Sequence, residues 1–513
     1  MATPQIRPTF RRTMLEVVWF KRDLRVHDHA PLTEAARRGP VLPLFIYEED
    51  VITADDFSSR HLGFLNECLS ELSEELTKLC TPLVTKRGKV TEVLGEIHRT
   101  HGPIRLWSHE ETGNAITYAR DLAVGGWCRE NGVEWTEIPQ HGVIRRLGNR
   151  DGWSARWKQR MDQPVIATPE AIRPGPATDS LGILTAKDFG LDETPDPHRQ
   201  TGGRRPALEL FDTFLTERGL DYTKAMSSPV TAFEACSRLS PYLSLGTLSI
   251  REAYQRGISQ RKKFYEWKDA GGELDPRWLS AMKSFLGRLR WHCHFIQKLE
   301  DEPSIEFENF ARVYDGMREP HWNEDRYQAW ATGHTGYPMV DACMRALIAT
   351  GWINFRMRAM LMSFASYHLW LHWRRTGLHL ARLFTDYEPG IHWSQCQMQS
   401  GTTGINTIRV YSPTKQVVDQ DPEGIFIRKW VPELKDVPKK FLAEPHTMPE
   451  MEQMMCGCVI GRDYPAPVVD HKTAYAEAQR RMRDLRKGNR ARAEASAIQQ
   501  KHGSRKRGTR TWR

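Results

Sequence analysis

The sequence predicts two domains, a doubly wound α/β domain followed by an all-α domain. In the first part of the chain, short apolar runs alternate with stretches of helical periodicity, a pattern typical of a parallel sheet covered by helices. After Pro206 the apolar residues recur at helical spacing in long stretches without proline. A chain of 513 residues is also too long to fold around one hydrophobic core.

The α/β domain is predicted over residues 14–146, where the alternation of strands and helices ends. Helical stretches separate the successive strands, so we expect the strands to be parallel. The strand-like runs are 16–20, 41–47, 82–84 and 104–107, and the helical stretches are 59–80, 90–99 and 114–130.

Three further segments are expected. Residues 147–205 contain several prolines and little periodicity, which predicts an interdomain connector. Residues 206–442 are the predicted helical domain, with its densest apolar stretches at 281–299 and 340–373. Residues 443–513 form a basic C-terminal extension.

The positive charge is concentrated in that extension. The whole chain carries a net charge of +9, of which residues 472–513 supply +11 and the remainder −2. Such a segment neutralises phosphates without reading sequence, so we expect DNA, damaged or non-specific, to bind the extension and the helical domain. The alternative is a solvated, partly helical extension. The basic residues concerned are Arg480, Arg481, Arg483, Arg486, Lys487, Arg505, Lys506 and Arg507.

Other classes of protein fit the sequence poorly. No apolar run is long enough to span a bilayer, and residues 1–12 lack the apolar core of a secretory signal. We therefore expect a soluble, cytoplasmic monomer without a membrane partner. The nine cysteines are scattered, and the only close pair, Cys456 and Cys458, has no second pair nearby, so reduced thiols and no metal site are expected.

Three motifs stand out. The first, Trp19 to Asp28, follows the first strand directly and places charged residues at the carboxyl end of a sheet, where α/β domains bind ligands. The second, Cys236 to Ser249, brings hydroxyls and backbone amides to a helix start and suits a diphosphate. Alternatively, the first is a structural ion-pair cluster and the second an ordinary helix cap.

The third motif is the most specific. It combines Gly333 to Ala342 with Gly351 to Arg358, and Arg358 is expected to face Asp386 in a buried ion pair. Taken alone, the pair is equally well a salt bridge between two helices. With the segments 400–413 and 430–434, the three motifs resemble the DNA photolyase/cryptochrome family through about residue 442.

The resemblance implies a helical FAD-binding domain that uses blue light to drive electron transfer. In the family, the second motif grips the FAD phosphates, and a cation beside the isoalloxazine ring stabilises the reduced, anionic flavin. The residues implied to bind FAD are Tyr222, Cys236, Ser237, Arg238, Leu239, Ser240, His292, Arg356, Arg358, Asp386, Tyr387, Glu388 and His392.

The resemblance also implies a lesion pocket, but this chain departs from the pattern of repair enzymes. Trp291 matches one aromatic wall, whereas Arg288 stands where those enzymes have a glutamate and Phe355 where they have an asparagine. The second wall falls near Met398, in a segment without an aromatic residue. Replacing an acceptor carboxylate by a cation removes a hydrogen bond of about 1.5–3 kcal/mol. These four residues are the expected catalytic positions.

Electron transfer and light harvesting follow from the same resemblance. Trp373 and Trp322 match the outer two members of the family's tryptophan chain, and the expected substitute for the inner member is Trp393, Tyr387 or Trp370. The N-terminal domain of the family can hold a second, antenna chromophore, whose identity stays open. Ile116 and Thr117 stand where a folate-binding member offers polar residues, which argues against folate.

Two functions are left open. The first is a photolyase-type enzyme that passes an electron from reduced FAD to a UV-induced pyrimidine lesion in DNA. The alternative is a cryptochrome-like blue-light photoreceptor that has lost lesion repair, with the extension or a partner reading the flavin redox state. An ordinary flavin dehydrogenase is disfavoured, because no Gly-x-Gly-x-x-Gly turn opens a helix after a strand.

Overall fold

The computed structural model describes residues 14–193 and 196–503. Its described N-terminal part is a parallel sheet of five strands in the order β3-β2-β1-β4-β5, so the predicted doubly wound α/β domain is confirmed. The strands are β1 (Leu15–Phe20), β2 (Val41–Tyr47), β3 (Val84–Arg87), β4 (Ile104–His109) and β5 (Glu134–Ile138).

The strand order reverses at β1, the central strand, which pairs with β2 on one side and with β4 on the other. At such a switch point the loops after the two strands diverge and leave a crevice at their carboxyl ends. The charged part of the first motif, which begins at Lys21 directly after β1, therefore lies at this crevice. β5 was not predicted, because its sequence Glu-Trp-Thr-Glu-Ile is mostly polar and marks an edge strand.

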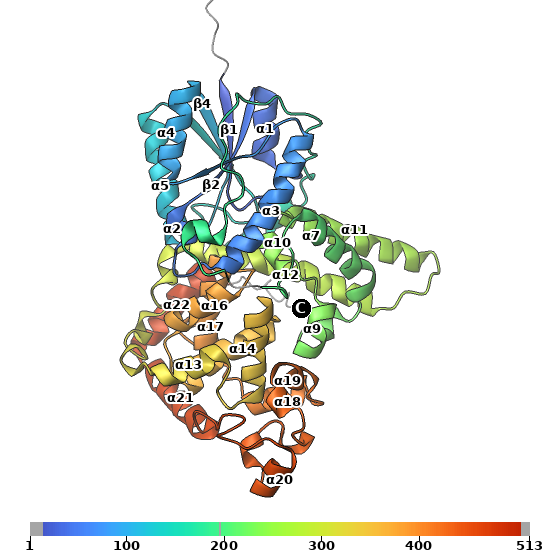
Figure 1. Cartoon of the computed structure of the whole chain (residues 1–513), viewed down its shortest axis with the longest axis vertical. Helices are drawn as coiled ribbons and strands as arrows, with labels where there is room; N and C mark the ends of the chain where they lie inside the picture. The colour runs from blue at the N-terminus through green and yellow to red at the C-terminus, as the bar shows by residue number, and fades with distance from the viewer. Residues whose placement is uncertain (1–13, 194–195, 504–513) are drawn as a thin grey trace, which may run out of the picture.

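Helices cover both faces of the sheet (Figure 1). The apolar sides of these helices pack against the sheet in two hydrophobic clusters. One of the clusters continues into the helical domain, where it includes Tyr242 and Phe285. The two domains are thus joined by a common core. The helices of the α/β domain are α1 (Ala30–Arg38), α2 (Glu49–Ile52), α3 (Ser59–Lys78), α4 (Val90–His101) and α5 (Ala115–Glu130).

The connector is more ordered than its prolines suggest. It contains α6 (Trp153–Met161) and a short 3-10 turn, η1 (Ala186–Phe189). Its backbone runs beside the sheet, since the Val41 amide donates to the Arg173 carbonyl (2.8 Å) and the Gly175 amide donates to the Val41 carbonyl (2.7 Å). The connector therefore packs along the α/β domain on its way to the helical domain.

The second domain is helical, as predicted. Gly351, in the left-handed region at φ 68°, ends α14, and Gly401, at φ 82°, ends α17, as expected for helix C-termini. Its main helices are α7 (Arg204–Thr213), α8 (Tyr222–Ala225), α9 (Pro229–Ala235), α10 (Ser240–Ser244), α11 (Ile250–Asp269), α12 (Arg277–Asp301), α13 (Glu324–Thr332), α14 (Pro338–Thr350), α15 (Phe355–Ser363), α16 (Trp373–Leu383), α17 (Pro389–Ser400), α18 (Pro413–Gln420) and α19 (Ile425–Trp430).

The C-terminal extension continues the helical domain as α20 (Glu450–Met455), α21 (His471–Arg486) and α22 (Asn489–His502). Several of its arginines have partners within the chain: Arg480 and Arg481 pair with Glu477, and Arg486 donates to the Asn406 carbonyl (2.7 Å). Arg505, Lys506 and Arg507 lie outside the described residues. Among the described helices, none has the length and apolar character needed to cross a membrane.

Candidate functional site

A cavity of about 860 Å³ lies in the helical domain, within the range of small-molecule and cofactor sites. It gathers side chains from helices that are far apart in the sequence, among them α8, α12, α15 and α17. Every residue that the resemblance assigns to FAD or to a lesion lines this cavity: Tyr222, Cys236, Ser237, Arg238, Leu239, Ser240, Arg288, Trp291, His292, Phe355, Arg356, Arg358, Asp386, Tyr387, Glu388, His392 and Met398. Their individual roles stay predictions.

The expected ion pair forms one wall of the cavity. Arg358 Nη1 donates to Asp386 Oδ1 (2.9 Å) and Nη2 donates to Oδ2 (2.8 Å). The guanidinium is held further by Nε, which donates to the Ile353 carbonyl (2.7 Å), and by the Phe384 ring 4.1 Å below it. Two parallel charge-assisted bonds fix the plane of the cation, so a ligand entering the cavity meets a preoriented positive charge.

The second motif supplies a cation and hydroxyls at another part of the cavity. Arg238 has a φ of 58°, which turns the chain sharply before α10. Its Nε donates to Gln200 Oε1 (3.0 Å), and its guanidinium lies 4.2 Å from the Trp352 ring centroid. Burial lowers the Arg238 pKa to about 10, so the side chain stays cationic and suits a phosphate flanked by Ser237 and Ser240.

Tyr387 and Glu388 form the wall toward the α/β domain. Arg22, from the first motif, lies 2.9 Å from Glu388 Oε2, and its Nη2 donates to the Tyr387 carbonyl (3.0 Å). The Tyr387 hydroxyl donates to Asp56 Oδ2 (2.6 Å). The charged turn after β1 therefore contributes structurally to the cavity, because it braces two residues that line it.

Changing Glu388 to glutamine is expected to flatten the pH dependence of stability between about pH 5 and 7. Burial raises the Glu388 pKa to about 7, above its value in the unfolded chain. The folded state therefore holds this proton longer, and stability falls as pH rises through the window, by at most about 1.4 kcal/mol per pH unit. Urea unfolding of both proteins at several pH values measures the difference; equal slopes would contradict the assignment.

Two histidines of the cavity are neutral. Burial lowers the pKa of both His292 and His392 to about 4. His392 Nε2 carries its proton, because it donates to the Gly377 carbonyl (2.9 Å). Neither ring therefore brings positive charge at neutral pH, so the positive charge of the cavity comes from its arginine and lysine side chains, among them Arg358 and Arg238.

The mouth of the cavity is aromatic and basic. Trp291 and Phe355 are 41% and 46% exposed and both line the cavity, so they present an apolar surface at its opening. Arg288 lies 6.0 Å from the Phe355 ring centroid, and its Nη2 contacts the Met226 sulfur at 3.7 Å. Arg288 thus stands beside an exposed ring at the mouth of the cavity.

The predicted tryptophans lie behind the cavity. Trp393 is fully buried, with the His392 ring 4.8 Å and the Trp373 ring 6.0 Å away. Trp373 is also fully buried, whereas Trp322 is partly exposed. None of the three lines the cavity. Trp393 and Trp373 therefore form a contacting pair next to His392, and their part in electron transfer stays a prediction.

Some lining residues escaped the sequence-based prediction. Asn354 is 1% exposed, and its Nδ2 donates to the Met226 and Ser227 carbonyls, while its Oδ1 has no hydrogen-bond partner among the described residues. A buried unpaired acceptor in a cavity wall is a position where a ligand donor fits. His502 and Gly503 also line the cavity, although no local pattern so near the C-terminus indicates it.

The first half of the third motif plays a structural part. Asp341 is fully buried and accepts from the Thr335 amide (2.8 Å), the Thr335 hydroxyl (2.6 Å), the Gly336 amide (3.1 Å) and the Tyr464 hydroxyl (2.6 Å). Residues 333–342 do not line the cavity. The motif therefore fastens the segment around Tyr464 to α14.

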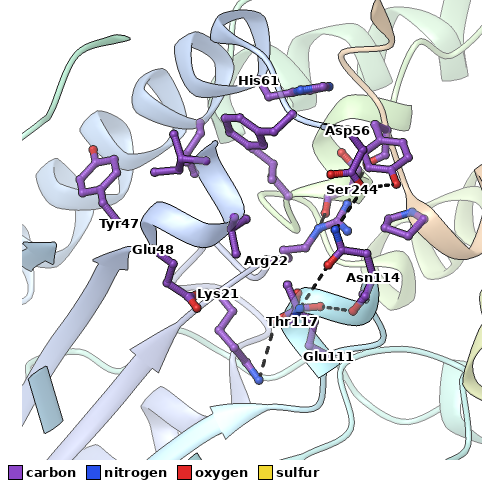
Figure 2. A pocket seen from close by; sticks show the side chains of 18 of the residues that line it. Lys21, Arg22, Tyr47, Glu48, Asp56, His61, Glu111, Asn114, Thr117 and Ser244 are labelled. Atoms are coloured by element: carbon purple, nitrogen blue, oxygen red, sulfur yellow. Dashed lines mark hydrogen bonds and ion pairs between the residues drawn. The ribbon is translucent and has the colours of Figure 1, made fainter. Parts of the chain in front are cut away.

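A second, smaller cavity of about 140 Å³ lies at the crevice of the α/β domain (Figure 2). It is bounded by the ends of β1 and β2, by α3, and by Ser244 and Tyr387 of the helical domain. Asn114 Nδ2 and the Tyr387 hydroxyl both donate to Asp56 Oδ2 in its wall. This volume is below the roughly 300 Å³ of most ligand pockets, and a second, antenna chromophore stays a prediction.

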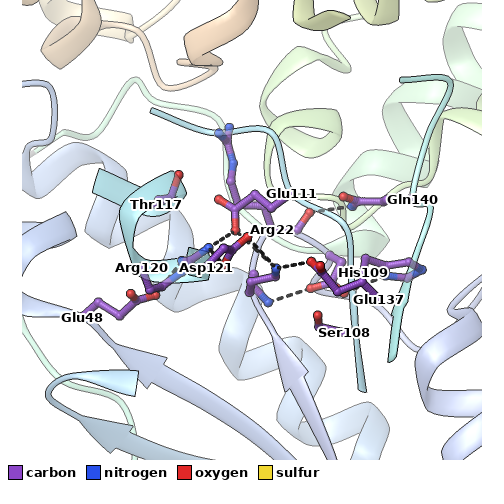
Figure 3. A network of polar contacts seen from close by, with 12 residues as sticks. Arg22, Glu48, Ser108, His109, Glu111, Thr117, Arg120, Asp121, Glu137 and Gln140 are labelled. Carbon is purple, nitrogen blue, oxygen red and sulfur yellow. Dashed lines mark hydrogen bonds and ion pairs between the residues drawn. The ribbon is translucent and has the colours of Figure 1, made fainter. Parts of the chain in front are cut away.

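A network of charged side chains borders this cavity (Figure 3). Arg120 pairs with Glu48 (2.8 Å), Glu111 (2.6 Å) and Asp121 (2.9 Å), while Lys21 Nζ lies 3.6 Å from Asp121 and 3.9 Å from Glu111. Buried charges of this kind persist only when they are paired. The charged side chains of this network therefore fill part of the crevice at the carboxyl ends of the strands.

Asp23, His29 and His109 form the one group of possible metal ligands found among the described residues. Asp23 Oδ2 accepts from His29 Nε2 (2.9 Å) and from His109 Nδ1 (2.7 Å). His29 Nδ1 accepts from the Leu32 amide, so the proton of the neutral ring is on Nε2 and blocks that atom as a ligand. The hydrogen bonds among these three side chains therefore stabilise the turn after β1.

Comparison with known proteins assigns both domains to the same protein family. Residues 16–149 match the family model described as DNA photolyase, and residues 285–484 match the model described as the FAD binding domain of DNA photolyase. A (6-4) DNA photolyase of Arabidopsis thaliana is 28% identical over 506 residues, which cover 91% of this chain and 87% of the relative. A cryptochrome DASH of Gloeobacter violaceus is 28% identical over 485 residues, covering 89% of this chain and 93% of the relative.

A solved structure agrees with the sequence matches. An archaeal photolyase from Sulfolobus tokodaii, determined with two FAD molecules, superposes with a TM-score of 0.74 at 25% identity, covering 92% of this chain and 100% of that chain. The similarity thus includes both the parallel sheet and the helices that surround the large cavity.

Proposed function

Since the chain belongs to the photolyase/cryptochrome family and carries its FAD-binding domain, we propose that it is a photolyase-type enzyme. In this proposal, reduced FAD in the large cavity absorbs blue light and passes an electron to a UV-induced pyrimidine lesion in DNA. The observation that carries the proposal is the convergence of all predicted FAD and lesion residues on one cavity of about 860 Å³.

The residues of the cavity fit FAD by their chemistry. Arg358, held by Asp386, offers a fixed positive charge to an anionic ring, and Asn354 Oδ1 offers an unpaired acceptor. Arg238, with Ser237 and Ser240 beside it, suits the diphosphate. When bound, FAD supplies one-electron chemistry driven by light. The protein orients the cofactor and, through its apolar walls, limits the access of water.

DNA is proposed to meet the mouth of the same cavity. A lesion flipped out of the duplex would stack on Trp291, since base-flipping enzymes hold the extruded base between aromatic or apolar side chains. Arg288 and Phe355 complete this surface, and Met398 lines the cavity below it. In the C-terminal extension, Arg480 and Arg481 are already paired with Glu477. The mouth of the cavity, rather than these arginines, is therefore the proposed main contact with DNA.

A repair assay tests the proposal. Purified, photoreduced protein is illuminated with oligonucleotides that carry either a cyclobutane dimer or a (6-4) photoproduct. Light-dependent restoration of one substrate is the expected result, and the unilluminated reaction serves as the control. Intact photoreduction of the flavin with restoration of neither lesion would count against an enzyme and in favour of a photoreceptor.

Photoreduction of the flavin is proposed to use Trp393 and Trp373. Changing Trp373 to phenylalanine should slow photoreduction at least several-fold, because phenylalanine preserves the packing against Trp393 (6.0 Å) but is much harder to oxidise. Absorbance under continuous blue light with a thiol reductant measures the rate. Trp330, buried but outside this pair, is the matched control, and an unchanged rate in the Trp373 variant would exclude this route.

A photoreceptor is the second candidate, because His502 and Gly503, at the end of α22, line the same cavity. A change in the charge of the flavin would act directly on a C-terminal element, as a signalling output requires. In both proposals a second, antenna chromophore of unknown identity would belong to the α/β domain, where the cavity at the crevice measures about 140 Å³.

A further inference from the structure

The three tryptophans that the family resemblance assigns to electron transfer differ in what their indole N–H groups contact. Trp393 Nε1 is buried and has no hydrogen-bond partner within residues 14–193 and 196–503. Trp373 Nε1 donates to the amide oxygen of Asn309 (2.8 Å). Trp322 Nε1 donates to the carboxylate of Glu324 (Oε2, 2.8 Å). Of these contacts, only the carboxylate is a base that can accept the indole proton.

The surroundings of Trp322 favour loss of that proton once the ring is oxidised. The guanidinium of Arg375 lies 3.7 Å from the ring centroid, so a positive charge on the ring is repelled by a fixed cation. Arg375 Nη2 is also 3.6 Å from Glu324 Oε2. Hydrogen bonds from Trp322 and Gln328 lower the pKa of Glu324, so its carboxylate is ionised at neutral pH, and its Oε2 already lies on the indole N–H.

The inner tryptophan meets a similar cation without such a base. Arg374 lies 4.1 Å from the centroid of the Trp393 ring, which makes a lasting positive charge on Trp393 unfavourable. Trp322 is partly exposed, and Arg375 extends from the start of α16, two residues after Trp373. The positive charge therefore comes to rest most favourably at Trp322, where it can be neutralised by proton transfer.

We propose that Glu324 is the proton acceptor that traps the oxidised state of Trp322 during light-driven electron transfer. The inference rests on the electron route of the proposed function. One electron leaves Trp322 and passes through Trp373 and Trp393 toward the cofactor. The N–H proton of the resulting radical cation moves to Glu324 Oε2, which gives a neutral tryptophan radical and a neutral glutamic acid. A thiol reductant later returns one electron, and Glu324 returns the proton.

Proton transfer has a functional consequence. A radical cation at Trp322 attracts the transferred electron back, whereas a neutral radical must first regain its proton. The transfer to Glu324 therefore delays recombination and raises the yield of reduced cofactor. Because Glu324 acts on Trp322 and touches neither cofactor nor substrate, it is a positioning residue for the reaction.

Changing Glu324 to glutamine tests this role, because glutamine keeps an acceptor oxygen for Trp322 but cannot take its proton. Transient absorption after a laser flash distinguishes the tryptophan radical cation from the neutral radical. We expect the neutral radical to dominate in the wild type. In the Glu324→Gln protein the cation should persist and recombine, with the yield of neutral radical lower by several-fold.

Asp325→Asn is the matched control, since Asp325 lies in the same first turn of α13 and loses the same charge. It should behave as the wild type. Neutral radical formed at the wild-type rate and yield in Glu324→Gln would overturn the inference and leave the route intact. Tryptophan radical signals that survive unchanged in Trp322→Phe would instead overturn the route, and the inference with it.

Discussion

Replacing Arg358 with leucine is expected to abolish flavin retention and to lower the free energy of unfolding by about 3–5 kcal/mol. The Asp386 side chain is 4% exposed and accepts two hydrogen bonds from Arg358. Without the guanidinium, an uncompensated carboxylate is left in the wall of the cavity, and the fixed charge offered to the flavin is lost. The flavin absorbance of the purified protein and its urea unfolding curve measure the two effects.

Two controls separate cofactor binding from stability. Arg345 pairs with Glu433 (2.7 Å), a carboxylate more exposed than Asp386, and does not line the cavity, so Arg345→Leu should destabilise less than Arg358→Leu and without loss of flavin affinity. The double change Arg358→Leu with Asp386→Leu removes both charges and should recover stability but not flavin. An Arg358→Leu protein that retains FAD with unchanged affinity would contradict the assignment of this pair to the cofactor.

Replacing Asp341 with alanine is expected to cost about 4 kcal/mol or more of stability. The change leaves four buried donor groups without their acceptor, on Thr335, Gly336 and Tyr464. Gly336 cannot readily shift to compensate, because it has a φ of 76° and lies tightly against Ala466. Denaturant unfolding monitored by circular dichroism measures the loss.

The flavin affinity of the folded Asp341→Ala protein should stay unchanged, because residues 333–342 lie outside the cavity. Tyr464→Phe removes only one of the hydrogen bonds to Asp341 and should cost about 1–2 kcal/mol. A loss of flavin binding by folded Asp341→Ala protein would show that the motif acts on the cofactor. A small loss of stability in Asp341→Ala would mean that the hydrogen bonds to Asp341 contribute less to folding than their geometry indicates.

Much of the candidate site could be predicted because its residues lie in compact motifs. Ser237, Arg238 and Ser240 follow one another closely, and the sharp turn at Arg238 points them toward one space. Arg358 and Asp386 are further apart, but the resemblance already pairs them. Residues linked by short segments carry their geometry in the local backbone, so a sequence motif is sufficient to find them.

Other features could not be predicted, because no local pattern encodes them. The polar strand β5 pairs only because β4 offers an edge. His502 reaches the cavity because α22 folds back, with His502 Nε2 2.6 Å from Glu302. The contact between Trp322 and Glu324 looks like an ordinary helix start in the sequence, and only the structure adds Arg375 above the ring.

The sequence by itself determined the two domains, the family and the set of side chains offered to a flavin, since periodicity and short motifs are properties of neighbouring residues. Only the tertiary structure decided that Arg22 braces Glu388 from the other domain and that charged side chains narrow the sheet crevice. The physical reason is that burial and pairing of charges depend on segments that meet in space, and their energies depend on distances that the chain order does not contain.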